Sequence, residues 1–437
     1  METRCWIRVG FFSLLGLVAG SIWTYSNQLG QSWGRITPAS GLSRGAGEPS
    51  ADLQPLCDSY FQGRGAFRWK RSGAAELGRG DPEEGGYCER LRPLLHASRS
   101  PPPAAEETLF PLAFVITVHK DADTLERLFR TIYRPHNLYC IHVDAKSPAH
   151  FQKRLHLLQS CFANVFFPSR VEPVVYAGIS RLEADLRCLA DLFQMRGRWN
   201  YVLNMCGQDY PLKTNLEMVR HLKAYKGKNI TPGILPPKHA KLRTKFVYKQ
   251  VLSLNNSYVI ATKKLKSPPP RNLTIYFGSA YYALTAEFVG FLLKDRRALD
   301  LLHWSRDTYS PDEHFWVTLN RIPEIKFPSC SSAVFGDRGG LRRSWNCVIG
   351  VPGSMPLAAW QGKLRAVKWQ NQKTHDGCHG HYSRGICIYG PEDLKWLNGN
   401  DALFANKFEL HTYPPTLECL EYRILNRSLS QNNITLR

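Results

Sequence analysis

The sequence lacks the glycine-rich phosphate-binding patterns that are easiest to recognise. Neither GxGxxG nor GxxxxGK[ST] occurs in its 437 residues. This argues against a dinucleotide-binding Rossmann enzyme and a P-loop NTPase. No internal repeat is visible either. Acidic residues are scarce: the chain has 36 Asp and Glu but 57 Lys and Arg, so its net charge is +21.

The excess of positive charge limits the kinds of ligand that the protein is expected to bind. In a nuclear protein it would suggest nucleic acid, but the basic runs of this chain have little aromatic interleaving, and we expect no nucleic acid. In a lumenal chain the charge favours anionic ligands such as sugar diphosphates, or a solvated basic surface.

The strand pattern "CIHVDAKS" (140–147) ends in one carboxylate, Asp144, with Lys146 two positions later. Enzymes that handle sugar nucleotides often carry a second carboxylate at this place, so that the pair holds a divalent cation against the diphosphate. If this chain binds such a ligand, other groups must neutralise the phosphates.

The N-terminus predicts a membrane anchor. Residues 9–25 are apolar and uncharged, and Arg4 and Arg8 precede them. We therefore expect a cytoplasmic tail (1–8), a signal anchor (9–25), a Gly-, Ser- and Pro-rich stem (26–107) and a lumenal domain (108–437) with an atypical insertion at 326–349. A cleaved signal peptide is the alternative for 9–25.

Cysteines and sequons favour an oxidising, lumenal or extracellular compartment. Eleven of the twelve cysteines follow the predicted anchor, where disulfides persist. Five Asn-x-Ser/Thr triplets are candidate glycosylation sites: Asn229, Asn255, Asn272, Asn426 and Asn433.

From residue 108 onward, strand and helix patterns alternate. "LFPLAFVITV" (109–118) predicts a fully buried strand, and Asp121 or Asp123 can cap the helix that follows. "LYCIHVD" and "YVLNMCGQDYP" predict further strands, and Ser147 with Pro148 is expected to open the helix between them. The alternation predicts an α/β domain with a mostly parallel sheet, whose functional groups lie at the carboxyl ends of strands, as Asp144 and Asp209 do.

Two acids lie at a predicted helix start in "DTYSPDEHFWVTLNRI" (307–322). Ser310 is the expected cap and Pro311 the first-turn residue. Asp312 or Glu313 can simply complement the helix dipole. Alternatively, one of them points into a cleft and accepts the proton of an attacking hydroxyl.

A second polar stretch is "HDGCHGHYSRGICIYG" (375–390). Its spacing allows a zinc site made of His375, Cys378, His379 and His381. A local disulfide between Cys378 and Cys387 is the simpler interpretation in an oxidising compartment, and it would hold the intervening Arg384 in a fixed loop.

Six segments in order resemble the core 2/I-branching β-1,6-N-acetylglucosaminyltransferases, and the I-branching members most: "YCIHVDAKSP", "CGQDYPLKTN", "NLTIYFGSAYYALT", "YSPDEHFWVTLNRIP", "GCHGHYSRGICIYG" and "LFANKFELHTYP". The likeness covers about residues 108–425, interrupted at 326–349. It implies a type II Golgi membrane protein with a GT-A-like fold, which transfers GlcNAc from UDP-GlcNAc with inversion and without a metal or other cofactor.

The resemblance also implies roles for single residues. Glu313 corresponds to the general base, and Arg384 and Lys407 to the cations that hold the diphosphate in place of a metal. Asp144 and His119 match positions near the uridine, Asp209 lies by the sugar-binding strand end, and Trp369 and Arg243 fall near acceptor-contacting positions. The family framework implies four disulfides and a free thiol at Cys206: Cys57–Cys419, Cys88–Cys161, Cys140–Cys188 and Cys378–Cys387. Cys330 and Cys347 are extra and can bridge each other.

Core 2 members carry Tyr two residues after the acceptor-site Trp, whereas Asn371 follows Trp369 here. The difference favours an I-branching acceptor, a galactose within poly-N-acetyllactosamine on glycoproteins and glycolipids. A core 2 or xylosyl-type transferase is the enzymatic alternative, and a non-catalytic lumenal glycan-binding protein is the other.

Overall fold

The structure is a computed structural model that describes residues 53–64, 86–100, 102–253, 256–323 and 364–433, with side chains to residue 431. These residues belong to one unit, Pro49–Arg437. The predicted anchor, most of the stem, the insertion with Cys330 and Cys347, and two sequons (Asn255 and the side chain of Asn433) lie outside the described residues. Among the helices that are described, none has the length and apolar character needed to span a bilayer.

A five-stranded sheet has the order β10-β4-β1-β2-β3. Its strands are β1 Leu112–Val118, β2 Leu138–Val143, β3 Val165–Phe166, β4 Tyr201–Cys206 and β10 Ala283–Thr285. β1 is parallel to β2 and β4, β2 is parallel to β3, and only β10 is antiparallel. All residues of β1 and β2 are buried, as in strands covered on both faces. The predicted α/β class with a mostly parallel sheet is confirmed.

The two faces of β1 belong to different parts of the core. Phe114 and Ile116 pack in a cluster with α6 (Ala122–Ile132) and α7 (Ala149–Ser160). Ala113 and Val115 pack in a second cluster with α8 (Ile179–Gln194), α11 (Ala286–Lys294) and α12 (Arg296–Ser305). This alternation is the period of two of a β-strand, and it explains why β1 is apolar except at Thr117, whose hydroxyl donates to Asp185 (3.1 Å).

The helix starts differ from prediction in detail. Asp121 caps α6, since its carboxylate accepts a hydrogen bond from Thr124 N (3.0 Å). Pro148 is the cap residue of α7 and not its first residue. Ser147 instead donates its hydroxyl to the carbonyl of His119 (3.1 Å), so it ties the loop after β1 to the loop after β2.

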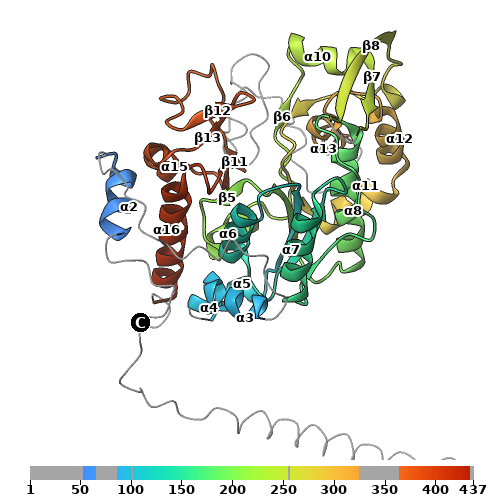
Figure 1. The fold of residues 1–437 in the computed structure, drawn as a ribbon. Coiled ribbons are helices and arrows are strands. Elements are labelled where there is room, and N and C mark those ends of the chain that lie inside the picture. Colours follow the sequence, from blue (N-terminus) through green and yellow to red (C-terminus); the bar gives the residue numbers. More distant parts are fainter. Residues whose placement is uncertain (1–52, 65–85, 101, 254–255, 324–363, 434–437) are drawn as a thin grey trace, which may run out of the picture. The chain divides into compact units, whose positions relative to one another are not determined.

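A second layer is built from C-terminal residues. β5 (Asp209–Pro211), β11 (Arg365–Ala366) and β14 (Phe404–Asn406) form a three-stranded sheet in the order β11-β14-β5. β12 (His381–Ser383) and β13 (Ile386–Ile388) form a hairpin. In Figure 1 this hairpin, α15 (Leu394–Asn398) and α16 (Pro414–Asn433) gather on one side of the unit, near α2 (Leu53–Gln62).

At the other end of the unit lie α10 (Lys238–Lys245) and the ribbon of β7 (Phe246–Val251) and β8 (Tyr258–Leu265) (Figure 1). β6 (Gly233–Ile234) pairs with β9 (Phe277–Gly278) beneath them. The remaining elements are short: α3 Tyr87–Leu91, η1 Arg92–Leu94, α4 His96–Arg99, α5 Ala105–Thr108, α9 Asn215–Ala224, η2 Pro270–Asn272, η3 Pro311–Glu313, α13 Phe315–Leu319 and η4 Pro391–Asp393.

Four disulfides are present among the described residues, Cys57–Cys419, Cys88–Cys161, Cys140–Cys188 and Cys378–Cys387. They are the four pairs that the resemblance implies. The first joins α2 to α16 across 362 residues of sequence. Cys206 is the free cysteine of the described part of the chain.

One predicted glycosylation site is wrong for the folded protein. Asn229 is 1% exposed, its amide nitrogen donates to Asn320 (3.2 Å) and its oxygen accepts from Thr285 N (2.9 Å). A glycan cannot be attached at this amide without breaking the core around it. Asn272 and Asn426 are exposed, and both stay predicted sites.

Candidate active site

The candidate site lies where strands of the two sheets end. His119 follows β1, Asp144 follows β2, Cys206 ends β4, and Lys407 follows β14. Because β1, β2 and β4 are parallel, their carboxyl ends share one edge of the sheet, where α/β proteins bind ligands.

Glu313 is the last residue of η3, a single 3-10 turn, and is not inside an α-helix. Ser310 adopts a left-handed conformation (φ 48°) and makes no side-chain cap, so its predicted capping role is wrong. The Glu313 side chain is 35% exposed, and its carboxylate accepts a hydrogen bond and ion pair from Arg243. Desolvation raises the pKa of Glu313, and Arg243 opposes that rise only in part.

Asp312 has different surroundings although it is adjacent in sequence. It is 8% exposed. Burial raises its pKa to about 7; the guanidinium of Arg181 opposes this, while the charges of Glu313 and Asp185 add to it. As expected from the sequence, the two neighbouring acids face different groups, and Glu313 is the more accessible one.

Arg243 holds the carboxylate of Glu313 from α10. Its guanidinium carbon lies 5.6 Å from the ring centroid of Tyr309 and 5.9 Å from that of Phe277, and Tyr309 N donates to its carbonyl (3.0 Å). Aromatic faces attract a cation and restrict its position. These contacts therefore give the Arg243 guanidinium a defined orientation toward Glu313.

Arg384 and Lys407 come from adjoining segments. Arg384 occupies the turn of the β12–β13 hairpin with φ 52°. Lys407 N donates to Cys387 O (3.2 Å), and Tyr389 N donates to Lys407 O (3.0 Å). Burial and then the positive charges of Arg384 and Lys120 lower the pKa of Lys407, although Cys206 and Glu409 oppose the shift. No described carboxylate forms an ion pair with either cation, so both are available to an anion.

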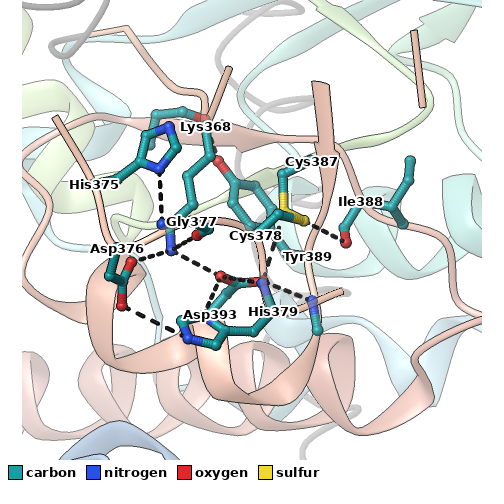
Figure 2. A network of polar contacts seen from close by, with 12 residues as sticks. Lys368, His375, Asp376, Gly377, Cys378, His379, Cys387, Ile388, Tyr389 and Asp393 are labelled. Atoms are coloured by element: carbon teal, nitrogen blue, oxygen red, sulfur yellow. Dashed lines mark hydrogen bonds and ion pairs between the residues drawn. A yellow bond between two sulfur atoms is a disulfide. The ribbon is translucent and has the colours of Figure 1, made fainter. Parts of the chain in front are cut away.

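The loop that carries Arg384 is fixed by a buried charge cluster (Figure 2). Lys368 is 0% exposed and donates to Asp376 (2.6 Å), Asp393 (2.8 Å) and Gly377 O (2.6 Å). Asp393 also accepts from the backbone N–H groups of His379 (3.2 Å) and Gly390 (2.9 Å). The cluster and the Cys378–Cys387 disulfide together hold both ends of the hairpin.

The zinc alternative for this loop is not supported. Both sulfurs of Cys378 and Cys387 are in the disulfide. The three histidines turn to separate partners: His375 to Trp369 O (3.0 Å), His379 to Asp393 (3.0 Å) and His381 to the Tyr413 hydroxyl (3.2 Å).

Asp144 and His119 follow the neighbouring strands β2 and β1. Asp144 is buried and accepts hydrogen bonds from Lys146 Nζ (2.8 Å) and Val174 N (3.1 Å). Desolvation, followed by the charges of Lys120, Lys146 and Arg384, lowers the pKa of His119, although Asp144 opposes this.

Asp209 does not face an open space, which corrects the expectation that it contacts a sugar. It is 0% exposed, and its carboxylate accepts from Cys206 N (2.8 Å), Asn406 Nδ2 (2.9 Å) and Arg365 Nη2 (3.1 Å). These bonds join β4, β5, β11 and β14. Asp209 therefore positions the strand that leads into Lys407.

Trp369 is half-buried and forms an isolated bridge with Ile386, beside the Arg384 turn. One carboxylate pair with Asp-x-Asp spacing, Asp121 and Asp123, does occur elsewhere in the chain. Asp121 caps α6, whereas Asp123 pairs with Arg154 (2.8 Å) and with His411 (3.0 Å). Both acids therefore already have protein partners.

Sequence reasoning missed Tyr176, an exposed aromatic residue that lies against Arg384. The guanidinium carbon of Arg384 lies 5.2 Å from its ring centroid, and Tyr176 is within electrostatic range of both Glu313 and Arg384. It also missed the cluster of Lys368 and Asp393. No spacing in the sequence signals either feature, because each depends on contacts between distant segments.

The Core-2/I-Branching enzyme family model matches residues 112–398. The chain belongs to this family. The match includes Asp144, Glu313 and Arg384, and Lys407 lies just beyond it.

Several curated proteins are similar to this family member over most of its length. The mouse (Mus musculus) N-acetyllactosaminide β-1,6-N-acetylglucosaminyl-transferase is 50% identical over 89% of this chain and 89% of its own. The human (Homo sapiens) protein of that name is 56% identical over 76% of each chain. The human probable β-1,3-galactosyl-O-glycosyl-glycoprotein β-1,6-N-acetylglucosaminyltransferase 7 is 40% identical over 87% of this chain and 84% of its own.

Proposed function

We propose that this Core-2/I-branching glycosyltransferase transfers GlcNAc from UDP-GlcNAc, in β-1,6 linkage, to a galactose of poly-N-acetyllactosamine. The observation that carries the proposal is that residues 176–177 contact both parts of the site: the Arg384 guanidinium carbon lies 5.2 Å from the Tyr176 ring centroid, and Ala177 O accepts from Ser310 N (2.8 Å), three residues before Glu313. The names of the relatives at 50% and 56% identity support the acceptor and the linkage.

In the proposed reaction, the acceptor 6-hydroxyl oxygen forms a bond to C1 of GlcNAc from the face opposite UDP. The bond between C1 and the phosphate oxygen breaks, and its electron pair leaves with UDP. The hydroxyl proton passes to Glu313, which its raised pKa makes a stronger base than an ordinary glutamate. Direct displacement of this kind inverts the configuration at C1.

Arg384 and Lys407 receive the charge that develops on the diphosphate. Fixed cations stabilise a departing anion without reorganising during the reaction, and a guanidinium can bind two phosphate oxygens at once. We therefore propose that the reaction needs no divalent metal. Lys120 lies close enough to Lys407 to lower its pKa, and it adds a third positive charge at the same edge.

Asp144 and His119 are proposed to lie near the uridine, because they follow the neighbouring strands β2 and β1. Trp369 and Arg243 are proposed to border the acceptor, since they flank the Arg384 turn and Glu313 respectively. A GT-A-like fold, in which a parallel sheet holds the nucleotide at its carboxyl edge, is consistent with this assignment.

The proposal also includes a location, the Golgi membrane with a lumenal catalytic domain. The apolar segment 9–25 after basic residues and the four disulfides support it. Microscopy of the tagged full chain against a Golgi marker tests this part separately from activity.

Product analysis tests the function. The full chain is incubated with UDP-GlcNAc and, side by side, a linear poly-N-acetyllactosamine and a core 1 O-glycan. We expect a β-1,6 branch on internal galactose of the first acceptor. A product on the core 1 acceptor alone would assign the chain to core 2 branching instead, and no product on either would contradict the proposal.

A further inference from the structure

Exposed apolar side chains of the described part of the chain are concentrated at one end. Of ten large hydrophobic residues that are more than 40% exposed, six fall within residues 235–265: Leu235, Leu242, Leu252, Tyr258, Ile260 and Leu265. A concentration of this kind in a folded protein marks an interaction surface, whereas single exposed apolar residues do not.

The register of the β7–β8 ribbon separates its two faces. Tyr248 and Gln250 face the rest of the protein: the Tyr248 ring lies 5.5 Å from that of Tyr309, and Gln250 accepts from Ser180. Because side chains alternate along a strand, the other face carries Lys249 paired with Ile260, and Val251 paired with Tyr258. Tyr258 and Ile260 are 46% and 48% exposed. We call this set of four residues the outer ribbon face.

The sequence of the same region carries charge of one sign, although Arg243, Lys266 and Arg271 pair with Glu313, Asp307 and Asp300 from other segments. Residues 218–286 contain thirteen Lys or Arg and no Asp or Glu. Lys249, Lys263 and Lys264 are exposed, and no described carboxylate forms an ion pair with any of them. Two copies of this surface placed face to face would bring like charges together, so self-association is disfavoured. The partner must therefore be anionic and must also accept apolar side chains.

We propose that the outer ribbon face, with its flanking lysines, binds an anionic lipid bilayer surface. Aromatic and aliphatic side chains enter the boundary between headgroups and acyl chains, while lysines extend their ammonium groups to the lipid phosphates. A soluble polyanion would use the lysines but would leave Tyr258 and Ile260 in water. Each further lysine at the surface strengthens attraction to anionic lipids.

Contact of this face with a bilayer orients the candidate active site. The inner face of the same ribbon touches Tyr309, which contacts Arg243, the partner of Glu313. Acceptors carried on the lipid surface would then be presented near Glu313. This consequence rests on the proposed function, whereas bilayer binding itself does not.

The test measures how fast lysines react with a water-soluble amine-acetylating reagent, read by mass spectrometry. The full chain is reconstituted in nanodiscs of phosphatidylcholine alone, or of two parts phosphatidylcholine to one part sulfatide, an acidic glycolipid suited to a lumenal leaflet, so that attachment by other segments is equal. We expect Lys249, Lys263 and Lys264 to react at least about threefold more slowly with the anionic lipid. The exposed Lys373 and Lys395 serve as references and should not change.

Two variants control the experiment. Tyr258→Ser with Ile260→Ser should abolish the protection, whereas Leu299→Ser, a similarly exposed apolar residue on α12, should keep it. Equal rates in both lipids would overturn the proposal, as would slowing of Lys373 and Lys395 to the same degree. Protection by soluble heparin but not by anionic nanodiscs would assign the surface to an acidic polymer instead. Because no turnover is measured, failure of the proposed function would leave these outcomes unaffected.

Discussion

Replacing Lys368 by Met should destabilise the protein strongly. The variant keeps most of the aliphatic stem next to Trp396, whose ring centroid is 5.1 Å from the ammonium. It removes the ammonium that Asp393 faces inside the protein, where both side chains are 0% exposed. Breaking a buried ion pair from one side costs about 3–5 kcal/mol. Asp393 keeps two backbone donors, so we expect a loss at the lower end, about 3 kcal/mol.

The matched control is Asp376→Asn. Asp376 contacts the same ammonium at 2.6 Å, but its side chain is 59% exposed, and exposed ion pairs contribute less than about 1 kcal/mol. Urea denaturation followed by tryptophan fluorescence, with disulfides intact, gives both free energies of unfolding. If Lys368→Met lowers stability no more than Asp376→Asn does, the buried cluster does not hold the hairpin as described. Without urea, Lys368→Met should also bind UDP more weakly, because the segment that supports the Arg384 turn is no longer held in place by Lys368.

Three further predictions concern the metal, the disulfide and pH. Transfer should continue after dialysis against EDTA, measured as product formed per minute; strict dependence on added Mn²⁺ would show that Arg384 and Lys407 do not replace a cation. A Cys378→Ser, Cys387→Ser double variant should lose UDP-GlcNAc affinity and turnover more than acceptor affinity, because freeing the Arg384 side chain costs roughly 1–2 kcal/mol at each binding event; equal losses in both affinities would contradict a role for the loop in diphosphate binding. Burial raises the pKa of Asp312 in the native state to about 7 from its ordinary 3.8. Between these two pH values the native state holds a proton that the unfolded state has lost, so the free energy of unfolding should fall as pH rises through this window. Asp312→Asn should remove that part of the pH dependence in urea titrations, and an unchanged profile would mean that the Asp312 carboxyl is not protonated there.

The sheet was predictable because its determinants are local. Parallel strands covered on both faces need continuous apolar sequence, and "LAFVITV" and "LYCIHV" have it. The cap at Asp121 was likewise readable, since a capping side chain binds a backbone N–H only three residues away. Cys378–Cys387 was also expected from its short loop in an oxidising compartment. The other three disulfide pairs came from the family resemblance, because the connectivity of many cysteines cannot be deduced from the sequence.

The wrong predictions concern residues whose surroundings are formed by segments far away in the sequence. Asn229 is a valid sequon, but contacts with Thr285 and Asn320 bury it. Asp209 was predicted at the carboxyl end of a strand, but it is the first residue of β5, and Arg365, from a strand more than 150 residues later, encloses it. Lys368 is an ordinary lysine in the sequence, and only Asp376 and Asp393 together make a buried ammonium tolerable.

The most direct test of the central claim is the transfer rate of Glu313→Gln. The amide oxygen can still accept a hydrogen bond from Arg243, but it cannot take the acceptor proton. Turnover should fall about 10²- to 10⁴-fold, while UDP affinity, measured by calorimetry, stays unchanged. Glu287→Gln, an exposed glutamate on α11, is the matched control and should transfer normally. Near-normal turnover of Glu313→Gln would contradict the assignment of Glu313 as the base.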